Sequence, residues 1–307
     1  MPEIVVLGSI NMDLVVRAER MPRPGETLRG DQFVTVPGGK GANQAAAAAR
    51  QGVGVAMVGR VGADSFGPLM LDNLRTQGVD VAHVGVDPEA ASGIAMIILD
   101  ARGENSIVVA PGANGRLSED DVAAAEALIR TARFLVLQLE VPLPVVKAAI
   151  AAANAHGVPV ILNAAPAMPV DMGLLRNVDT LIVNELEAEA LSGRPVPDLA
   201  AARQAGARLH GWGVPVVIIT LGARGALLLS EADEAHVLAR AVKVVDTTAA
   251  GDAFVGGFVA ARLRGLDLLS AVEYANCAGA LATTVLGAQT SLPSGDQVRA
   301  LFAEARQ

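Results

Sequence analysis

The sequence is poor in cysteine, in aromatic residues and in long apolar runs, and each shortage excludes something. The single cysteine, Cys277, excludes an internal disulfide and fits a cytosolic protein, in which a small buried thiol is its expected role. Hydrophobic residues make up 52% of the chain, yet the apolar runs stay short of the about 18 residues that a membrane span needs. The first residues have neither a basic leader nor a long apolar region, so we expect no signal peptide.

Basic residues and clustered histidines are also scarce. The formal net charge of -8 argues against nucleic acid or an anionic membrane as the main partner. It leaves room for a phosphate-bearing ligand, because converging backbone N–H groups can bind an anion within an acidic protein. The four histidines are far apart in the sequence and lack the spacing of zinc ligands, so we expect no zinc site.

What the chain does contain is a regular alternation of strand and helix patterns. This order predicts an α/β fold in which a mostly parallel central sheet carries helices on both faces, within one domain spanning residues 1–307. Strands are predicted at residues 4–7, 55–58, 134–139, 158–162, 180–183, 216–220 and 241–245. Helices are predicted at residues 44–50, 119–130, 144–155, 185–191, 199–210, 253–263, 268–285 and 295–306.

Two segments interrupt this alternation. Residues 14–37 are broken by prolines and glycines and contain one expected strand at 32–36. Residues 92–110 have the pattern of a β-hairpin with Gly103 in its turn. Hairpins inserted into such an alternation often belong to a small accessory sheet, which is what we expect here.

The chemistry is expected in the sequence DTTAAGDAF at residues 246–254. The segment lies between the expected strand at 241–245 and the expected helix at 253–263, so it is predicted to form a strand-to-helix turn. Polar residues are concentrated there, within an otherwise apolar part of the chain.

Small residues in this turn leave the backbone accessible. Ala249, Ala250 and Gly251 allow successive N–H groups to converge on an anion, helped by the positive end of the helix dipole. Asp252 is then a carboxylate base beside a cradle for negative charge, an arrangement suited to phosphoryl transfer to a hydroxyl. The alternative is that Asp252 only caps the helix.

Polar residues also follow several of the expected strands. Asn11 can donate and accept hydrogen bonds and Asp13 can accept them, which suits either vicinal sugar hydroxyls or a local turn. At the carboxyl ends of parallel strands such residues share one edge of the sheet, where these folds bind ligands. Each of them also suits a cap or a turn. The later strand-end residues are Glu140, Asn163, Asn184 and Thr220.

A glycine-rich segment, PGGKGAN, covers residues 37–43. It is not a phosphate-binding Walker A loop, because the spacing differs and Gly41 stands where Ser or Thr is required. Its glycines suit close backbone approach to a ligand, a hinge or an ordinary loop.

The segment at 246–254, followed by VGGF, resembles the carboxy-terminal signature of the ribokinase-like (PfkB) family of sugar and nucleoside kinases. The sequence GKGANQA at 39–45 and PGAN at 111–114 are similar to the ribose-phosphorylating members in particular. The motifs occur in family order over essentially the whole chain. One departure is Ala249, where many members have Gly; its methyl group narrows the allowed backbone slightly, although ribose-phosphorylating members also use Ala.

The resemblance implies ATP-dependent phosphorylation of D-ribose at its terminal hydroxymethyl oxygen, giving ribose 5-phosphate, with Asp252 as general base. The anion hole is then formed by Ala249, Ala250, Gly251 and Asp252. It also implies that segments 14–37 and 92–110 form a β-sheet lid over the sugar and a homodimer contact. The implied partners are ATP and a small sugar, with no nucleic acid and no membrane.

The resemblance also assigns ligand contacts, residue by residue. For the sugar these are Asn11, Asp13, Gly39, Lys40, Asn43, Glu140 and Asp252. For the nucleotide they are Asn184, Thr220, Gly222, Gly225, Gly251 and Asn276. Magnesium is assigned to Glu187, through water, and a monovalent cation such as potassium to Asp246, Thr248, Ala282, Val285, Gly287 and Ser291.

Other functions stay open at this point. Related kinases act on deoxyribose, fructose or nucleosides, although an aromatic content of 3% leaves little material for stacking a nucleobase. A sugar-binding regulator without catalysis is a second class, against which the retention of Asp252 argues. An NAD-dependent oxidoreductase is disfavoured because the dinucleotide-binding fingerprint is missing.

Overall fold

The computed structural model describes residues 2–102 and 105–304. Gly103, predicted for the hairpin turn, and the last residues of the helix predicted at 295–306 lie outside these ranges. None of the helices in the described ranges is long and apolar enough to cross a membrane.

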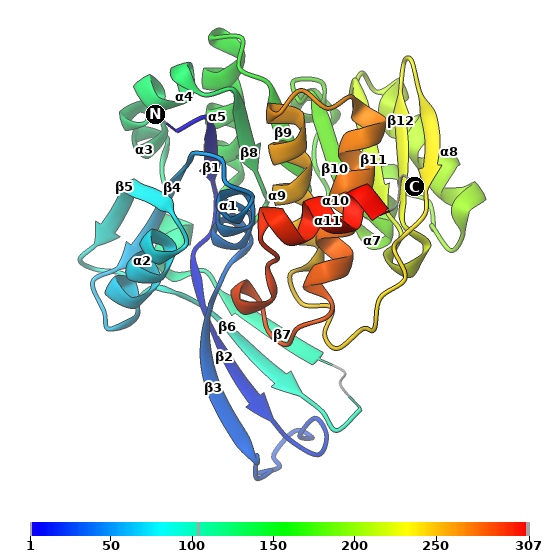
Figure 1. The fold of residues 1–307 in the computed structure, drawn as a ribbon. Coiled ribbons are helices and arrows are strands. Elements are labelled where there is room, and N and C mark those ends of the chain that lie inside the picture. The colour runs from blue at the N-terminus through cyan, green and yellow to red at the C-terminus, as the bar shows by residue number, and fades with distance from the viewer. Residues whose placement is uncertain (1, 103–104, 305–307) are drawn as a thin grey trace.

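The large sheet has nine strands in the order β13-β12-β11-β10-β9-β8-β1-β4-β5 (Figure 1). Seven neighbouring strands, from β11 to β5, are parallel, and β12 and β13 are antiparallel additions at one edge. The mostly parallel sheet is therefore confirmed. The strands are β1 Ile4–Leu7, β4 Val55–Gly62, β5 Val79–Asp87, β8 Phe134–Leu137, β9 Val160–Asn163, β10 Thr180–Asn184, β11 Val216–Thr220, β12 Ala226–Ser230 and β13 Glu234–Val237.

Helices cover both faces of this sheet because its strands are apolar on both sides. In β1, Val5 and Leu7 belong to one buried cluster and Ile4 and Val6 to another. The first cluster packs against helices α3 Glu119–Ala124, α4 Glu126–Thr131, α5 Leu143–Ala155, α6 Met172–Leu175, α7 Glu185–Ser192 and α8 Leu199–Gly211. The second packs against α1 Lys40–Arg50, α2 Phe66–Thr76, α9 Ala250–Leu263, α10 Leu268–Ala282 and α11 Gly295–Glu304.

The two interrupting segments form a second sheet, as expected. It has four strands in the order β3-β2-β6-β7 and extends away from one end of the large sheet (Figure 1). The central pair β2 and β6 is parallel, whereas the outer pairs are antiparallel. Its strands are β2 Asn11–Arg17, β3 Gln32–Gly38, β6 Gly93–Leu99 and β7 Asn105–Ala110.

The strand predicted at 241–245 is wrong. This segment is irregular, and Val244 and Val245 are 59% and 56% exposed. A β-branched run becomes a strand when it pairs and packs, and here the sheet already ends at β13. The segment at 246–254 therefore does not connect a strand to a helix. Instead, α9 begins inside that segment, at Ala250, three residues earlier than predicted.

The helix predicted at 119–130 is also wrong as a single helix. It is divided at Ala125, whose N–H group is shared between the carbonyls of Asp121 at 3.2 Å and Val122 at 3.1 Å. This sharing tightens the turn and breaks the regular ladder. Two other helix boundaries move by three or four residues: α1 begins at Lys40 and α10 ends at Ala282.

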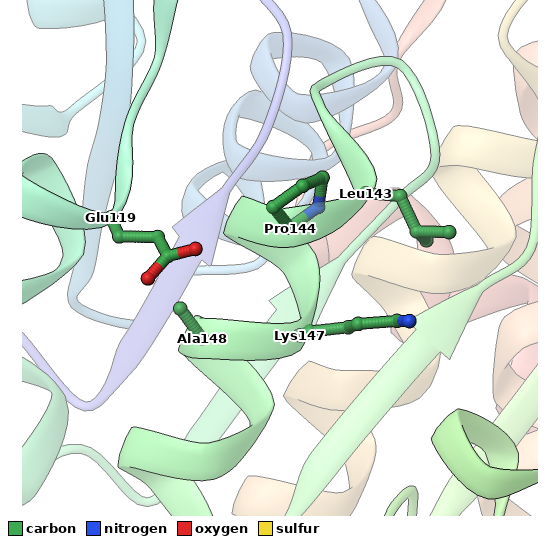
Figure 2. Close-up of a pocket in the computed structure, with 5 residues that line it drawn as sticks. All are labelled: Glu119, Leu143, Pro144, Lys147 and Ala148. Atoms are coloured by element: carbon green, nitrogen blue, oxygen red, sulfur yellow. The ribbon is translucent and has the colours of Figure 1, made fainter.

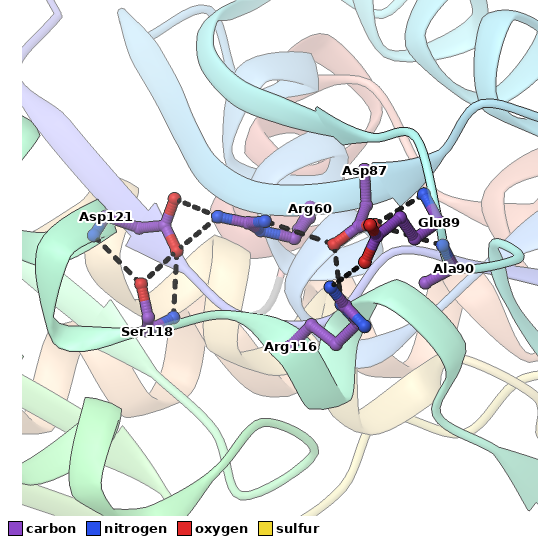
Figure 3. A network of polar contacts seen from close by, with 7 residues as sticks. All are labelled: Arg60, Asp87, Glu89, Ala90, Arg116, Ser118 and Asp121. Atoms are coloured by element: carbon purple, nitrogen blue, oxygen red, sulfur yellow. Dashed lines mark hydrogen bonds and ion pairs between the residues drawn. The ribbon is translucent and has the colours of Figure 1, made fainter.

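An ion-pair network ties β4 and β5 to the segment before α5 (Figure 3). Oδ2 of the buried Asp87 accepts hydrogen bonds from Arg60 at 3.1 Å and Arg116 at 2.9 Å. Arg60 also donates to both carboxylate oxygens of Asp121, at 2.7 and 2.8 Å. The network lies at the end of β5 and braces the start of α3.

Candidate active site

Asp252 lies in the first turn of α9 and is only 8% exposed. Its Oδ2 accepts a hydrogen bond from Nδ2 of Asn43 at 2.9 Å, and its Oδ1 accepts one from Nε2 of Gln44 at 3.0 Å. Burial raises the pKa of the Asp252 carboxyl group, while the Lys40 ammonium and these two donors lower it. The carboxylate is thus buried and held in place by two hydrogen-bond donors, an arrangement that suits a general base.

The backbone before Asp252 turns sharply at Ala249. This residue has φ 58 and ψ 8, a left-handed conformation that no other non-glycine residue in the described ranges adopts. For an L-residue it costs about 1–2 kcal/mol. The methyl group at 249 therefore does more than narrow the backbone slightly: it occupies a strained position, of the kind that often marks a functional site.

Ala250 and Gly251 open the helix directly after this turn. The Ala250 N–H group donates weakly to the Thr247 carbonyl at 3.3 Å. The next amides of the first turn have no acceptor one turn earlier in a regular helix, so they can bind an anion. At Gly251 no atom outside its chain neighbours and its own helix backbone lies within 4 Å of the place where a β-carbon would be. The α9 start is therefore open to a ligand on the side of Gly251.

Four carboxylates surround one ammonium group at the start of α1. Burial lowers the pKa of Lys40, but the carboxylates of Asp252, Glu140, Glu187 and Asp13 raise it overall. Two of these carboxylates also accept from backbone N–H groups: Oε2 of Glu140 from Lys40 at 3.1 Å and Oε2 of Glu187 from Asn184 at 2.8 Å. The cluster joins residues predicted for the sugar with one predicted for magnesium.

Asn11 and Asp13 lie at the start of β2, where the two sheets meet. Oδ1 of Asn11 accepts from Nδ2 of Asn114 at 2.7 Å, which leaves the Asn11 amide nitrogen as a donor. Burial, followed by the negative charges of Glu140 and Asp252, raises the pKa of Asp13 to about 7. A donor and a strong acceptor thus stand side by side, as vicinal hydroxyls require.

Glycine is required in the adjoining segment. Gly39 has φ 89, and a β-carbon there would lie 2.7 Å from the amide nitrogen of Asn11. At Gly38 a β-carbon would lie 2.3 Å from Oδ2 of Asp13. These glycines let α1 begin directly against β2, which brings Lys40 and Asn43 to the same place as Asn11 and Asp13.

The strand-end residues lie along one edge of the sheet, as predicted, because β8, β9, β10 and β11 are parallel neighbours. Their side chains also have structural partners. Asn184 and Glu187 form a reciprocal capping box at α7, with N–H to side-chain distances of 2.8 Å in both directions. Oγ1 of Thr220 donates to the carbonyl of Val183 at 3.3 Å.

The remaining predicted nucleotide residues surround the turn after β11. Gly222 has φ 55 and open space around its α-carbon, whereas a β-carbon at Gly225 would lie 2.0 Å from the carbonyl of Val237. Nδ2 of Asn276 donates to that same carbonyl at 3.1 Å. Gly222 is therefore free to approach a ligand, while Gly225 and Asn276 fasten β13 to α10.

The predicted cation residues are joined only in part. Oδ1 of Asp246 accepts from the N–H group and hydroxyl of Thr248, at 2.9 and 2.7 Å, and its Oδ2 accepts from Gly287 N–H at 2.8 Å. The hydroxyl of Ser291 donates instead to the Ala288 carbonyl. Ala282 is buried and Val285 is exposed, on either side of Thr283, whose carbonyl accepts from the Asp246 N–H group.

Residues 1–295 match the model of the pfkB family of carbohydrate kinases. The chain belongs to this family. A ribokinase of Haemophilus influenzae is 41% identical over 291 residues, which cover 95% of each chain. A deoxyribokinase of Salmonella typhi is 39% identical over 296 residues, which cover 96% of this chain and 97% of the deoxyribokinase. A solved structure of Arabidopsis thaliana ribokinase complexed with ribose and ATP has a TM-score of 0.90 and 34% identity, covering 98% of each chain. The expected resemblance and the ribokinase-like fold are thereby confirmed.

Four polar residues at this pfkB kinase site were not among those predicted. Ser9 donates to Glu140 at 2.6 Å, and Asn114 orients Asn11. Gln138 donates to Gln44, which donates to Asp252. The available signal was an apolar sequence context: Gln44 precedes five consecutive alanines, and Gln138 follows an apolar run at 134–137. Amide side chains in such places need partners.

Two further observations concern metal ligands and a second pocket. Within residues 2–102 and 105–304, no cluster of three or more His, Cys, Asp or Glu side chains could hold a metal ion directly. A separate pocket lies between α3 and the start of α5 and is lined by Glu119, Leu143, Pro144, Lys147 and Ala148 (Figure 2). None of these lining residues is among those predicted for the sugar, nucleotide or cations.

Proposed function

We propose that this pfkB-family enzyme transfers the terminal phosphoryl group of ATP to the hydroxymethyl oxygen of D-ribose, giving ribose 5-phosphate and ADP. The observation that carries the proposal is the buried Asp252 carboxylate in the first turn of α9, next to the open space at Gly251. The ribokinase relatives and the similarity to a ribokinase complexed with ribose and ATP support the choice of substrates.

Sugar binding falls to the residues gathered between α1 and β2. This group contains both hydrogen-bond acceptors, the carboxylates, and donors, the amide and ammonium groups. Ribose hydroxyls can donate to the former and accept from the latter. Lys40 also balances the surrounding negative charge. The proposed set is Asn11, Asp13, Gly39, Lys40, Asn43, Glu140 and Asp252.

In the chemical step, Asp252 takes the proton of the hydroxymethyl group as the new oxygen–phosphorus bond forms. The bond between the terminal phosphorus and the bridging oxygen breaks, and ADP leaves with that electron pair. Amides of Ala249, Ala250, Gly251 and Asp252 stabilise the charge on the transferring group.

The nucleotide is proposed to lie along the carboxyl ends of β10 and β11, against Asn184, Thr220, Gly222, Gly225, Gly251 and Asn276. Gly222 supplies the exposed backbone, and the fixed positions of Gly225 and Asn276 shape the wall.

Magnesium is proposed to accompany ATP, where it neutralises phosphate charge when bound. The protein fits an ion held mainly by phosphate and water, because both oxygens of Glu187 already accept hydrogen bonds from Asn184. Glu187 is buried and within electrostatic range of Lys40 and Asp252. We therefore assign Glu187 to water molecules around the ion.

A monovalent cation, potassium or a similar ion, is proposed near Asp246, Thr248, Ala282, Val285, Gly287 and Ser291. Hydrogen bonds from Thr248 and Gly287 lower the pKa of Asp246, so its charge is retained. Asp246 accepts a hydrogen bond from Gly287 and so connects the turn at 287 to the segment before α9. A cation bound there would therefore stabilise the backbone of the anion hole.

The small sheet is proposed to act as a lid over the sugar and to pair with a second copy in a homodimer. Its exposed apolar residues favour this role: Phe33, Met96, Ile107 and Val108 are all more than half exposed. A cytoplasmic location fits the use of ATP and the single cysteine.

The test is ADP release with ATP and magnesium across ribose, 2-deoxyribose, fructose and several nucleosides, each with and without potassium. Preference for ribose with potassium activation supports the substrate and the cation site. Preference for another sugar keeps the mechanism and replaces the substrate; the deoxyribokinase relative makes 2-deoxyribose the first competitor. Ribose binding without turnover would instead indicate a sugar-binding regulator.

A further inference from the structure

Gln44 is the second α1 side chain that touches Asp252, and it is almost completely buried, at 1% exposure. Its Nε2 donates both to Oδ1 of Asp252 at 3.0 Å and to Oδ1 of Asn163 at 2.9 Å. Its Oε1 accepts from Nε2 of Gln138 at 2.7 Å. Both amide hydrogens and the carbonyl oxygen of Gln44 are therefore occupied by other side chains.

The end of β9 fixes the direction of this amide. Nδ2 of Asn163, at the end of β9, donates to the carbonyl of Ile182 at 3.0 Å, so its Oδ1 faces Gln44. Gln138, just after β8, is fully buried and donates to Gln44, while its own Oε1 has no protein partner, so the Gln138 amide follows the Gln44 orientation. Turning the Gln44 amide over would place its oxygen against Oδ1 of both Asp252 and Asn163 and its nitrogen against the Gln138 nitrogen. The structure thus permits one orientation.

Asn43 differs from Gln44 in what it is free to do. Nδ2 of Asn43 holds the other carboxylate oxygen, Oδ2, but Oδ1 of Asn43 is buried without a protein partner. A sugar hydroxyl can satisfy that oxygen. Gln44 has no such vacancy and is committed to the protein.

We propose that Gln44 is a positioning residue for phosphoryl transfer: it holds Oδ1 of Asp252 so that Oδ2 faces the acceptor hydroxyl. Asn163 orients Gln44 in turn, and Gln138 satisfies the Gln44 oxygen. The inference rests on the proposed function, in which Asp252 receives the hydroxyl proton.

The Gln44 hydrogen bond also affects the protonation of Asp252. Burial raises the pKa of Asp252, and the hydrogen bonds from Asn43 and Gln44 oppose that rise. The charged groups that face the carboxylate from the neighbouring elements are Lys40, Glu140, Asp13 and Glu187. None of them changes when Gln44 is replaced, so loss of its donor should raise the Asp252 pKa.

The experiment replaces Gln44 by methionine, which has a similar shape and no amide. We expect kcat for the preferred sugar to fall about 10- to 100-fold with KM changed less than about threefold, because misplacement of a base acts on the chemical step. The acidic limb of the profile of kcat/KM against pH should move to higher pH.

Gln51→Met is the matched control. Gln51 caps the same helix and is 2% exposed, and its Nε2 donates to the Pro293 carbonyl at 3.1 Å while its Oε1 accepts from the Tyr274 hydroxyl at 2.8 Å. This variant loses a buried amide without touching Asp252. It should lose stability and keep the wild-type pH limb.

If Gln44→Met fails to fold, Gln138→Met tests the same chain of contacts one residue further away, with a smaller change in the same direction. Wild-type kcat and an unmoved pH limb in a folded Gln44→Met or Gln138→Met protein would overturn the proposal, as would equal effects at Gln44 and Gln51. The wild-type sugar panel separates the two proposals. A different preferred sugar leaves this test standing, whereas absence of turnover with every sugar overturns both.

Discussion

Asn43 donates a hydrogen bond from its Nδ2 atom to Oδ2 of Asp252 across 2.9 Å, although 209 positions separate the two residues in the chain. The contact depends on close packing of α1 against α9. A β-carbon at Gly256 in α9 would lie 2.5 Å from the β-carbon of Ala47 in α1, so the helices can approach only because glycine faces alanine there. The small residues of both helices therefore place the base against the proposed sugar ligands.

Replacement of Asp252 by alanine should lower kcat by about 10²–10⁴ and change ATP affinity little, because the carboxylate acts on the hydroxyl proton. Steady-state kinetics and titration with a non-hydrolysable ATP analogue measure the two effects. Asp72→Ala serves as control, since the Asp72 side chain is 72% exposed in α2. Near-normal turnover in Asp252→Ala would refute the general-base role.

Ala249 offers a test of backbone strain at the anion hole. Glycine adopts φ 58 without the steric cost of a β-carbon, so Ala249→Gly should leave the free energy of unfolding unchanged or raise it by up to about 1 kcal/mol. Ala249→Val should lower it by about 1–3 kcal/mol, because a β-branched residue is poorly tolerated at positive φ. Urea unfolding distinguishes these outcomes. Equal stability of the glycine and valine variants would show that the turn relaxes instead.

Much of the large sheet follows from the sequence because buried parallel strands are short β-branched runs that alternate with helices. Ile4–Leu7 and Val216–Thr220 were predicted from such runs and are strands. Residues 241–245 have the same local pattern and are irregular, because no neighbouring strand is available there. Local preference alone does not tell which run finds a partner.

The site was predicted in the same uneven way. Asp252 and the small residues before it are a local pattern, so their position at a helix start was accessible from sequence, although the exact start was not. The contacts of Gln44 and Gln138 were not, since each depends on helices and strand ends far apart in the chain. The left-handed backbone at Ala249 was not predicted, because alanine itself gives no sign of positive φ, although the glycine that many family members have there is such a sign.

The network in Figure 3 predicts acid sensitivity at Asp87. Hydrogen bonds from the Glu89 and Ala90 amides, with Arg60 and Arg116, hold the pKa of Asp87 at about 2, below its ordinary 3.8. A depressed carboxyl pKa adds stability above about pH 4 that is lost as the pH falls toward 2. Asp87→Asn should therefore lower the urea midpoint at pH 7, and its difference from wild type should shrink near pH 3. A pH-independent difference would show that packing, and not charge, is what the substitution removes.

The raised pKa of Asp13 predicts that its contribution to the free energy of unfolding depends on pH in the opposite way. Burial, together with the charges of Glu140 and Asp252, raises its pKa to about 7 despite Lys40. Because the folded protein binds this proton more tightly than the unfolded chain does, the neutral form favours folding. Stability from this group is present below about pH 4 and is lost as the pH rises to about 7.

Asp13→Asn removes that titration and should make the protein more stable than wild type at pH 8, with a smaller difference at pH 5. Glu187 and Asp252 also have raised pKa values, so wild-type stability falls for several reasons, and only the difference between the two proteins isolates Asp13. The same substitution should raise KM for ribose about tenfold or more, because a charged acceptor for hydroxyls is lost. Urea unfolding at both pH values and sugar kinetics at pH 8 measure this exchange of stability for binding. An Asp13→Asn protein less stable than wild type at pH 8 would show that the Asp13 carboxylate is held by favourable contacts, contrary to this account.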